Sequence, residues 1–282
     1  MTSIADSLQA GASALRDADV PDGIREATSL LKFAIARDRA FIIAHPEYEL
    51  TDKEAELFRN SIARRAAREP FQHIVGRQEF YGLDFLVTPD VLIPRPETEL
   101  IVERAIELLT PLPSPRFLEI GVGSGCISVA LLKHCPKASA EAVDISDPAI
   151  EVARRNANMH GVGDRLNILN SDIFESIADE KFDLIVSNPP YVPLDEYADL
   201  QPEVRDHDPR IAVTDGSTGL TVIERIVDRA PKHLVSGSHL LMEIGYGQRE
   251  RVSSLFDPAV WKAVGFLHDL QQIARAVDAE LS

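Results

Sequence analysis

The chain has 282 residues, of which 45% are hydrophobic, so it is long enough for one large domain or for a domain with a smaller partner. No stretch reaches the ~20 uncharged apolar residues of a membrane span, and the acidic N-terminus lacks the features of a signal peptide. The net charge of −16 disfavours nucleic acid binding, while two cysteines and scattered histidines indicate a reducing compartment and no metal site. We therefore expect a cytoplasmic protein with no metal, no membrane association and no direct nucleic acid binding.

The first part of the chain has the pattern of a small helical domain. Apolar residues recur at helical spacing through residues 30–35, and Thr51 with Glu54 has the form of a capping box. No convincing strand pattern occurs before residue 70. The sequence therefore predicts a domain of three or four helices over residues 1–70.

A structured connector is predicted next, over residues 71–95. Aromatic and β-branched residues surround Gly82 as in a short hairpin, and prolines follow. Pro96 is expected near the first turn of a helix that continues to Leu109.

From Arg116 onward, short apolar runs alternate with helical segments. We expect helices at 126–133, 147–160 and 219–234 between the runs RFLEIG, AEAVDI, LNILNSD, FDLIVSN and SHLLMEIG. Such alternation is typical of a mostly parallel sheet covered by helices on both faces. Residues 96–282 are therefore predicted to form an α/β domain with a Rossmann-like sheet.

A glycine-rich loop follows the first of these strands. Its residues are Glu119, Ile120, Gly121, Val122, Gly123, Ser124 and Gly125. The dinucleotide fingerprint requires a third glycine one residue later, so this loop instead resembles the first motif of class I S-adenosylmethionine-dependent methyltransferases. Glycine turns are common in doubly wound folds, and the loop alone leaves another nucleotide ligand open.

Two further strand ends carry an acid followed by an apolar residue. Asp144 lies nineteen positions after Gly125, close to the offset at which a carboxylate binds a ribose diol. At the next strand end, Asp172 is placed to accept a hydrogen bond from an adenine amino group. Ile145 and Ile173 are candidate apolar walls for the ring.

The strand FDLIVS runs directly into Asn188, Pro189, Pro190 and Tyr191. The two prolines stiffen the turn, and the Asn188 side-chain carbonyl and the Pro189 main-chain carbonyl can accept both hydrogens of a planar NH₂ group. The Tyr191 ring can stack on a flat amide or base. We interpret these four residues as catalytic and substrate-binding, with Asn188 also binding the cofactor; the alternative is a simple stop after a strand.

The connector QHIVGRQEFYGLDFLVTPDVLIPRPETE, the loop EIGVGSGCIS, the strand IVSNPPYVP and their spacing together resemble the HemK/PrmC family of release factor glutamine methyltransferases. This resemblance implies a seven-stranded methyltransferase sheet, a helical N-terminal domain for substrate recognition and a hairpin connector. It also implies S-adenosylmethionine as cofactor and class-one peptide chain release factors as partners. The methyl acceptor would be the side-chain amide nitrogen of glutamine in their Gly-Gly-Gln motif.

Departures from the family pattern affect partner fit more than reaction type. The sequence of residues 203–213 differs from the usual family sequence, and Ile173 stands where some members have an aromatic residue. Arg95 is interpreted either as a substrate-orienting residue or as part of a domain-bridging ion pair. Arg64, Arg65 and Arg68 are expected on a solvated helix face or against a partner protein.

Three other functions stay open from sequence. The NPPY turn also occurs in RNA and DNA amino-methyltransferases, which the acidic charge disfavours. A ribosomal protein glutamine is a second possible acceptor. A non-catalytic cofactor-dependent binding protein is the third, and intact Asn188 and Tyr191 count against it.

Overall fold

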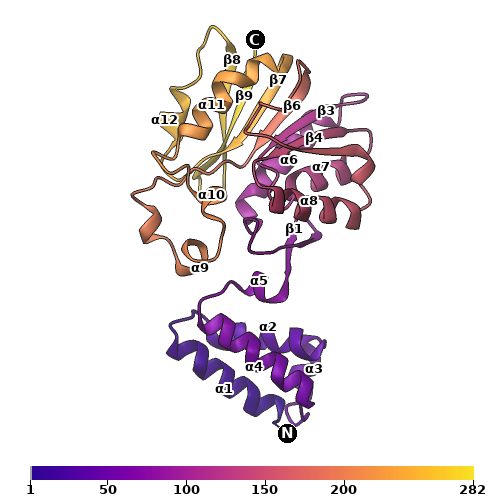
Figure 1. The fold of residues 1–282 in the computed structure, drawn as a ribbon, viewed down its shortest axis with the longest axis vertical. Coiled ribbons are helices and arrows are strands. Elements are labelled where there is room, and N and C mark those ends of the chain that lie inside the picture. Colours follow the sequence, from indigo (N-terminus) through magenta and orange to yellow (C-terminus); the bar gives the residue numbers. More distant parts are fainter. Residues whose placement is uncertain (1) are drawn as a thin grey trace. The chain divides into compact units, whose positions relative to one another are not determined.

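A seven-stranded sheet occupies the C-terminal part of the chain, in the order β5-β4-β3-β6-β7-β9-β8 (Figure 1). The first five of these strands are parallel, and β9 is antiparallel to both neighbours. The computed structural model describes residues 2–282. The strands are β3 Arg116–Ile120, β4 Ser139–Asp144, β5 Leu166–Asn170, β6 Phe182–Ser187, β7 Leu234–Glu243, β8 Trp261–His268 and β9 Ala274–Leu281. This sheet confirms the predicted α/β, Rossmann-like fold class.

Helices cover both faces of the sheet because successive strand residues point to opposite sides. On β6, Leu184 and Val186 join a buried cluster with residues of α6 Glu99–Leu109, α7 Cys126–His134 and α8 Asp147–Met159. Ile185 joins a second cluster with residues of α11 Thr221–Arg229 and α12 Arg249–Ser253. The strands are apolar on both sides for this reason.

The order of the strands reverses beside β3. Strands β4 and β5 extend the sheet on one side of β3, whereas β6 and β7 extend it on the other. Ligands of open α/β sheets bind outside the carboxyl ends of the strands at such a switch point. The glycine loop after β3 and the NPPY turn after β6 both begin there.

A β-hairpin precedes this sheet. Strands β1 Arg77–Phe80 and β2 Leu83–Leu86 are joined by Tyr81 and Gly82, whose φ angles are 51° and 73°. Two successive positive φ angles are typical of a type I′ turn, which matches the twist of the flanking strands. Phe80 and Phe85 are buried in the first cluster and attach the hairpin to the sheet domain.

Five helices form the N-terminal region: α1 Ile4–Asp17, α2 Gly23–Ile35, α3 Arg39–Ala44, α4 Asp52–Ala66 and α5 Phe71–Val75. They enclose a hydrophobic cluster of their own, which includes Leu15, Leu30 and Phe58. The predicted capping box is present at the start of α4, where Thr51 N–H donates to Glu54 Oε2 at 2.8 Å and Glu54 N–H donates to Thr51 Oγ1 at 3.3 Å. Among residues 2–282, no helix is long and apolar enough to cross a membrane.

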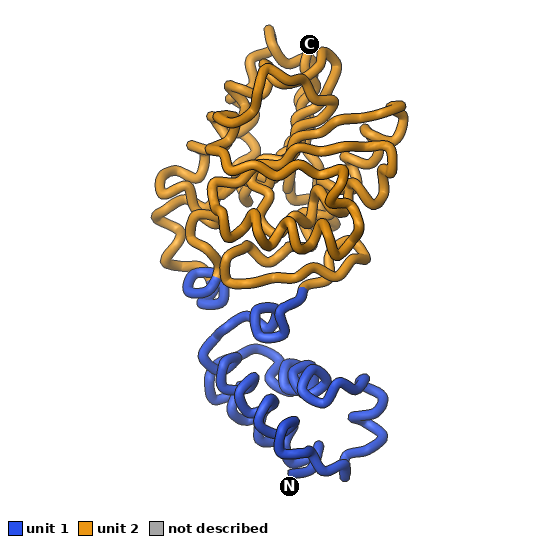
Figure 2. The backbone as a smooth tube through the Cα atoms, turned by 45° about the vertical axis from the view of Figure 1, so that its right-hand side comes forward, with its two compact units in different colours: residues 1–77, 201–207 blue, residues 78–200, 208–282 orange. Residues whose placement is uncertain are grey.

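The chain divides into two compact units, and the division differs from the linear one that the sequence suggested. Unit 1 contains residues 1–77 and also residues 201–207, and unit 2 contains residues 78–200 and 208–282 (Figure 2). The 201–207 segment includes α9 Pro202–Arg205, and α10 Arg210–Val213 follows it. The sequence analysis did not predict that part of the long connection between β6 and β7 belongs to unit 1.

Glu203 holds the 201–207 segment to α4 within unit 1. Its carboxylate accepts hydrogen bonds from Arg65 Nη1 at 3.0 Å and from Arg68 Nε at 2.8 Å and Nη2 at 2.7 Å. Burial alone would raise the pKa of Glu203, but the hydrogen bonds from Arg68 and Arg65 lower it to about 2. The segment is therefore fixed by a charge-assisted network.

These contacts overturn the expectation that the arginines near the end of α4 form a free basic surface. The Arg65 side chain is only 8% exposed and also binds Glu26, and Arg64 pairs with Glu69. The sequence pattern showed three positive charges but not the acidic partners, two of which are distant in the chain.

Candidate active site

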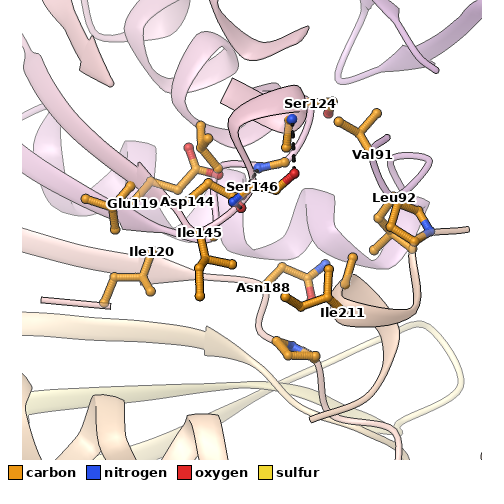
Figure 3. Close-up of a pocket in the computed structure, with 18 of the residues that line it drawn as sticks. Val91, Leu92, Glu119, Ile120, Ser124, Asp144, Ile145, Ser146, Asn188 and Ile211 are labelled. Atoms are coloured by element: carbon orange, nitrogen blue, oxygen red, sulfur yellow. Dashed lines mark hydrogen bonds between the residues drawn. The ribbon is translucent and has the colours of Figure 1, made fainter. Parts of the chain in front are cut away.

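A cavity of about 310 Å³ lies at the carboxyl ends of β3, β4, β5 and β6. Figure 3 shows Glu119, Asp144, Ser146, Asn188 and Ile211 around it. The loops after these four strands line the cavity, together with residues in the ranges 90–95 and 209–215. The structure therefore brings the predicted glycine loop, both strand-end aspartates and part of the NPPY turn to one site.

The glycines of the loop after β3 have two different roles. Gly123 has a φ of 51°, and a Cβ added there would meet nothing within 4 Å. At Gly125, with a φ of 79°, an added Cβ would lie 3.2 Å from the Ala153 Cβ on α8. Gly123 thus leaves the backbone open to a ligand, whereas Gly125 allows α7 and α8 to approach closely.

Asp144 links the glycine loop to the end of β4. Its Oδ2 accepts from Gly123 N–H at 2.9 Å, and its Oδ1 accepts from Ser146 N–H at 3.0 Å. Burial raises the pKa of Asp144 against the effect of these bonds. Because each carboxylate oxygen has a second lone-pair direction, the group can still accept hydrogen bonds from a diol.

Glu119 lines the cavity, but its carboxylate is bound by the start of α7. Oε2 accepts from Ser128 N–H at 2.9 Å and from the Ser128 hydroxyl. The residue is 1% exposed, and this burial raises its pKa to about 8. The predicted contact of Glu119 with the cofactor stays a prediction. The observed hydrogen bonds join the end of β3 to the first turn of α7, on either side of the glycine loop.

The raised pKa of Glu119 predicts how Glu119→Gln will affect stability. Between pH 4.5 and pH 8 the folded state keeps a proton that the unfolded state has lost, so wild-type stability falls as pH rises through this window. We expect the stability of Glu119→Gln relative to wild type to increase by about 2 kcal/mol from pH 6 to pH 8. Urea unfolding at both pH values measures this difference, and a constant difference would contradict it.

Asp172 and Ile173 follow β5 and line the cavity as well. Asp172 Oδ2 accepts a hydrogen bond from Arg225 Nη2 at 2.8 Å, which leaves Oδ1 and the second lone pair of Oδ2 for a ligand. Ile173 has a φ of 57° and is 6% exposed, whereas Ile145 is 52% exposed. Arg225 on α11 also lines the cavity, and sequence reasoning did not identify it.

The NPPY turn faces the cavity in part. Asn188 and Pro190 line it, whereas Pro189 and Tyr191 are not among the lining residues. The Tyr191 hydroxyl donates to Glu243 Oε1 at 3.0 Å, and burial raises the pKa of this hydroxyl. The predicted stacking of the Tyr191 ring on a ligand stays a prediction, since the ring packs against the second cluster.

Two residues that the sequence analysis missed stand behind Asn188. Asn188 Nδ2 donates to Thr98 Oγ1 at 3.1 Å, and the Thr98 hydroxyl donates to Glu243 Oε2 at 2.6 Å. Glu243 is the last residue of β7 and Thr98 the last of the 3-10 helix Pro96–Thr98. An acid at the end of the apolar run SHLLMEIG was a usable signal for Glu243, as it was for Asp144.

Arg95 lines the cavity and donates from Nη2 to Asp208 Oδ2 at 2.6 Å. The two residues belong to the same unit, so this pair is not the domain bridge considered from sequence. It connects the stretch before α6 to the stretch before α10. Within residues 2–282, no cluster of three or more His, Cys, Asp or Glu side chains suits a metal ion.

Comparisons with known proteins match both parts of the chain. Family profiles match residues 6–76 (PrmC N-terminal domain) and residues 98–200 (methyltransferase small domain). A methyltransferase structure from Pyrococcus furiosus has a TM-score of 0.54 and 17% identity, over 82% of this chain and 98% of that one, which supports the fold alone.

Two relatives are close enough to show the family. The release factor glutamine methyltransferase of Geobacter sulfurreducens is 45% identical over 242 residues, 86% of this chain and 84% of the relative. That of Cereibacter sphaeroides is 41% identical over 277 residues, 98% of both chains. The resemblance inferred from the motifs is confirmed: the chain belongs to the release factor glutamine methyltransferase family.

Proposed function

We propose that this protein transfers a methyl group from S-adenosylmethionine to the side-chain amide nitrogen of glutamine in the Gly-Gly-Gln motif of class-one peptide chain release factors. The observation that carries the proposal is the position of Asn188 on the same cavity as the glycine loop and Asp144. A site that holds both a nucleoside and a planar amide suits this reaction. The family relationship supports the choice of acceptor.

The residues present fit S-adenosylmethionine. The open backbone at Gly123 and the carboxylates of Asp144 and Asp172 are suited to its amino acid, ribose and adenine parts, respectively, and Ile145 to the face of the ring. When bound, this cofactor supplies an electrophilic methyl group on its sulfonium. Asn188 and Pro189 then have to hold the acceptor in line with it.

An amide nitrogen is a weak nucleophile because its lone pair is delocalised. The Asn188 Oδ1 and the Pro189 carbonyl accept the two N–H groups of the glutamine side chain and orient its nitrogen. Both acceptors also favour the positive charge that develops on this nitrogen during attack. No general base is required before attack, because the proton can leave after the methyl group has been transferred.

The proposal is tested by methyl transfer from radiolabelled S-adenosylmethionine to a purified class-one release factor. A release factor with the Gly-Gly-Gln glutamine substituted, ribosomal proteins, RNA and DNA are assayed alongside. Label on the release factor that disappears with the substitution supports the proposal. Label only on ribosomal protein or nucleic acid would overturn the acceptor assignment while keeping the NPPY chemistry.

Asp144→Ala is expected to weaken S-adenosylmethionine binding by about 10- to 100-fold, since it removes a charged acceptor and releases Gly123. Isothermal titration calorimetry measures the change. Asp164→Ala, which alters an exposed aspartate, is the matched control and should bind like wild type. Equal affinity of the two variants would contradict the assignment.

The N-terminal helices are proposed to recognise the folded release factor. Residues 2–70 form helices around their own core, and none of them lines the cavity. Deletion of residues 1–68 is expected to abolish methylation of whole release factor while S-adenosylmethionine binding is retained. Methylation at the wild-type rate by the deleted protein would refute this role.

The working place of the protein is proposed to be the cytoplasm, where translation takes place. Both cysteines, Cys126 and Cys135, are free thiols, which suits a reducing compartment. Cell fractionation followed by immunodetection tests this, and recovery outside the cytoplasmic fraction would overturn it.

A further inference from the structure

A chain of hydrogen bonds connects Asn188 to two buried residues that the proposed chemistry does not use directly. Thr98 and Glu243 are 2% and 3% exposed, so they exchange hydrogen bonds with protein groups and not with bulk water. The chain runs from Asn188 Nδ2 to Thr98 Oγ1, from the Thr98 hydroxyl to Glu243 Oε2, and from the Tyr191 hydroxyl to Glu243 Oε1. It joins the ends of β6 and β7 to the start of α6.

The direction of this chain follows from the number of hydrogens available. A threonine hydroxyl has one hydrogen, and in the structure Thr98 donates it to Glu243 Oε2 at 2.6 Å. Burial raises the pKa of Glu243 and the hydrogen bonds from Thr98 and Tyr191 lower it, and this direction of the chain belongs to the ionised carboxylate, which only accepts. The Thr98 oxygen can then only accept at its second contact. The Asn188 atom at 3.1 Å from it must therefore be the NH₂ nitrogen.

This direction determines which Asn188 group faces the glutamine. The two ends of an asparagine amide have nearly the same shape, so packing alone does not distinguish Oδ1 from Nδ2. A reversed Asn188 would direct NH₂ at the NH₂ of the acceptor and would lose the hydrogen bond that orients it. We propose that Thr98 and Glu243 are positioning residues that keep Asn188 Oδ1 as the acceptor for the substrate amide, which rests on the proposed function.

Tyr191 takes part in the same arrangement from the other oxygen of Glu243. Its hydroxyl occupies Oε1, so Glu243 has a fixed donor on each side and cannot turn away from Thr98. Gln248 Nε2 donates to the Tyr191 carbonyl at 2.8 Å and holds the backbone of the turn. Together these contacts allow one orientation of the Asn188 amide, with Nδ2 toward Thr98.

The test compares Thr98→Val with Thr98→Ser. Valine keeps the shape of threonine and removes both hydrogen bonds, whereas serine keeps the hydroxyl. Glu243→Gln is a second variant, since a glutamine NH₂ can donate to Thr98 and so allow the chain to reverse. Thermal unfolding first verifies that each variant is folded at the assay temperature.

The first readout needs no substrate. The chain has six asparagines, so ¹⁵N-asparagine labelling gives six side-chain amide signals, and loss of one in Asn188→Asp assigns it. We expect exchange of the Asn188 amide protons with water to be at least about tenfold faster in Thr98→Val and unchanged in Thr98→Ser. Equal exchange in wild type and Thr98→Val would overturn the proposal.

The second readout is single-turnover methyl transfer to release factor at saturating cofactor. Thr98→Val is expected to lower the rate about 10- to 100-fold and Glu243→Gln by a smaller factor, with S-adenosylmethionine affinity within about twofold of wild type. Thr98→Ser should restore the rate. A purely structural role would lower the melting temperature and leave the rate of the folded variants unchanged, which would overturn the proposal. If wild type labels no release factor, the proposed function fails and the amide exchange still decides this inference.

Discussion

Asn188→Ala is expected to lower the rate of methyl transfer by about 10³-fold. The substitution removes the side-chain acceptor that aligns the substrate nitrogen and stabilises the charge developing on it. It leaves the glycine loop and Asp144 unchanged, so S-adenosylmethionine should bind with an affinity close to that of wild type. Single-turnover labelling of release factor, together with calorimetry of cofactor binding, measures the two effects separately.

The matched control is Asn167→Ala, which removes the same side chain from an exposed position on β5. This variant should methylate at the wild-type rate. Loss of less than tenfold in Asn188→Ala would mean that the Pro189 carbonyl alone orients the acceptor. Loss of cofactor binding in Asn188→Ala would instead show that the cofactor contact predicted for Asn188 contributes strongly to affinity.

Gly219→Ala is expected to destabilise the protein by about 3 kcal/mol and to impair methyl transfer. Gly219 has a φ of 75°, and an added Cβ would lie 2.2 Å from the Tyr191 carbonyl oxygen and 3.0 Å from the Pro193 nitrogen. Both atoms are backbone, so the turn has to move to relieve the clash. Chemical unfolding and the methyl transfer rate measure the two consequences.

Gly216→Ala separates the clash from the backbone strain. Gly216 has the same φ of 75°, but an added Cβ would meet nothing within 4 Å. This variant should lose only about 1 kcal/mol and keep the wild-type rate of methyl transfer. Equal effects of the two substitutions would show that Gly219 does not hold the NPPY turn in place.

The parts of the site that directly follow strands could be predicted from the sequence. The hydrophobic pattern identifies each strand, and the residues just after it lie at the carboxyl edge of the sheet. An apolar run that ends in a glycine loop, in Asp144 or in Asn188 marks the carboxyl edge of a parallel sheet, and such edges coincide in space. The same local logic predicted the capping box of Thr51 and Glu54, which depends on residues three apart. Hairpin formation at Gly82 is equally local.

The unpredicted parts depend on contacts between residues that are distant in the chain. Thr98 and Glu243 are 145 positions apart, and Asp172 and Arg225 are 53 positions apart. No periodicity relates such residues, so their pairing becomes visible only in the folded structure. For the same reason, the hydrogen bond from the Tyr191 hydroxyl to Glu243, 52 positions away, was not predicted.

The membership of residues 201–207 in unit 1 determines which segments must be exchanged together when chimeras of this enzyme and a relative are made. Glu203 is encoded far from Arg65 and Arg68, yet the three side chains form one network. A chimera that takes residues 1–77 from a relative and the rest from this chain would place Glu203 of this chain against the relative's residues at positions 65 and 68. The helices and the 201–207 segment should therefore be exchanged together, as one block.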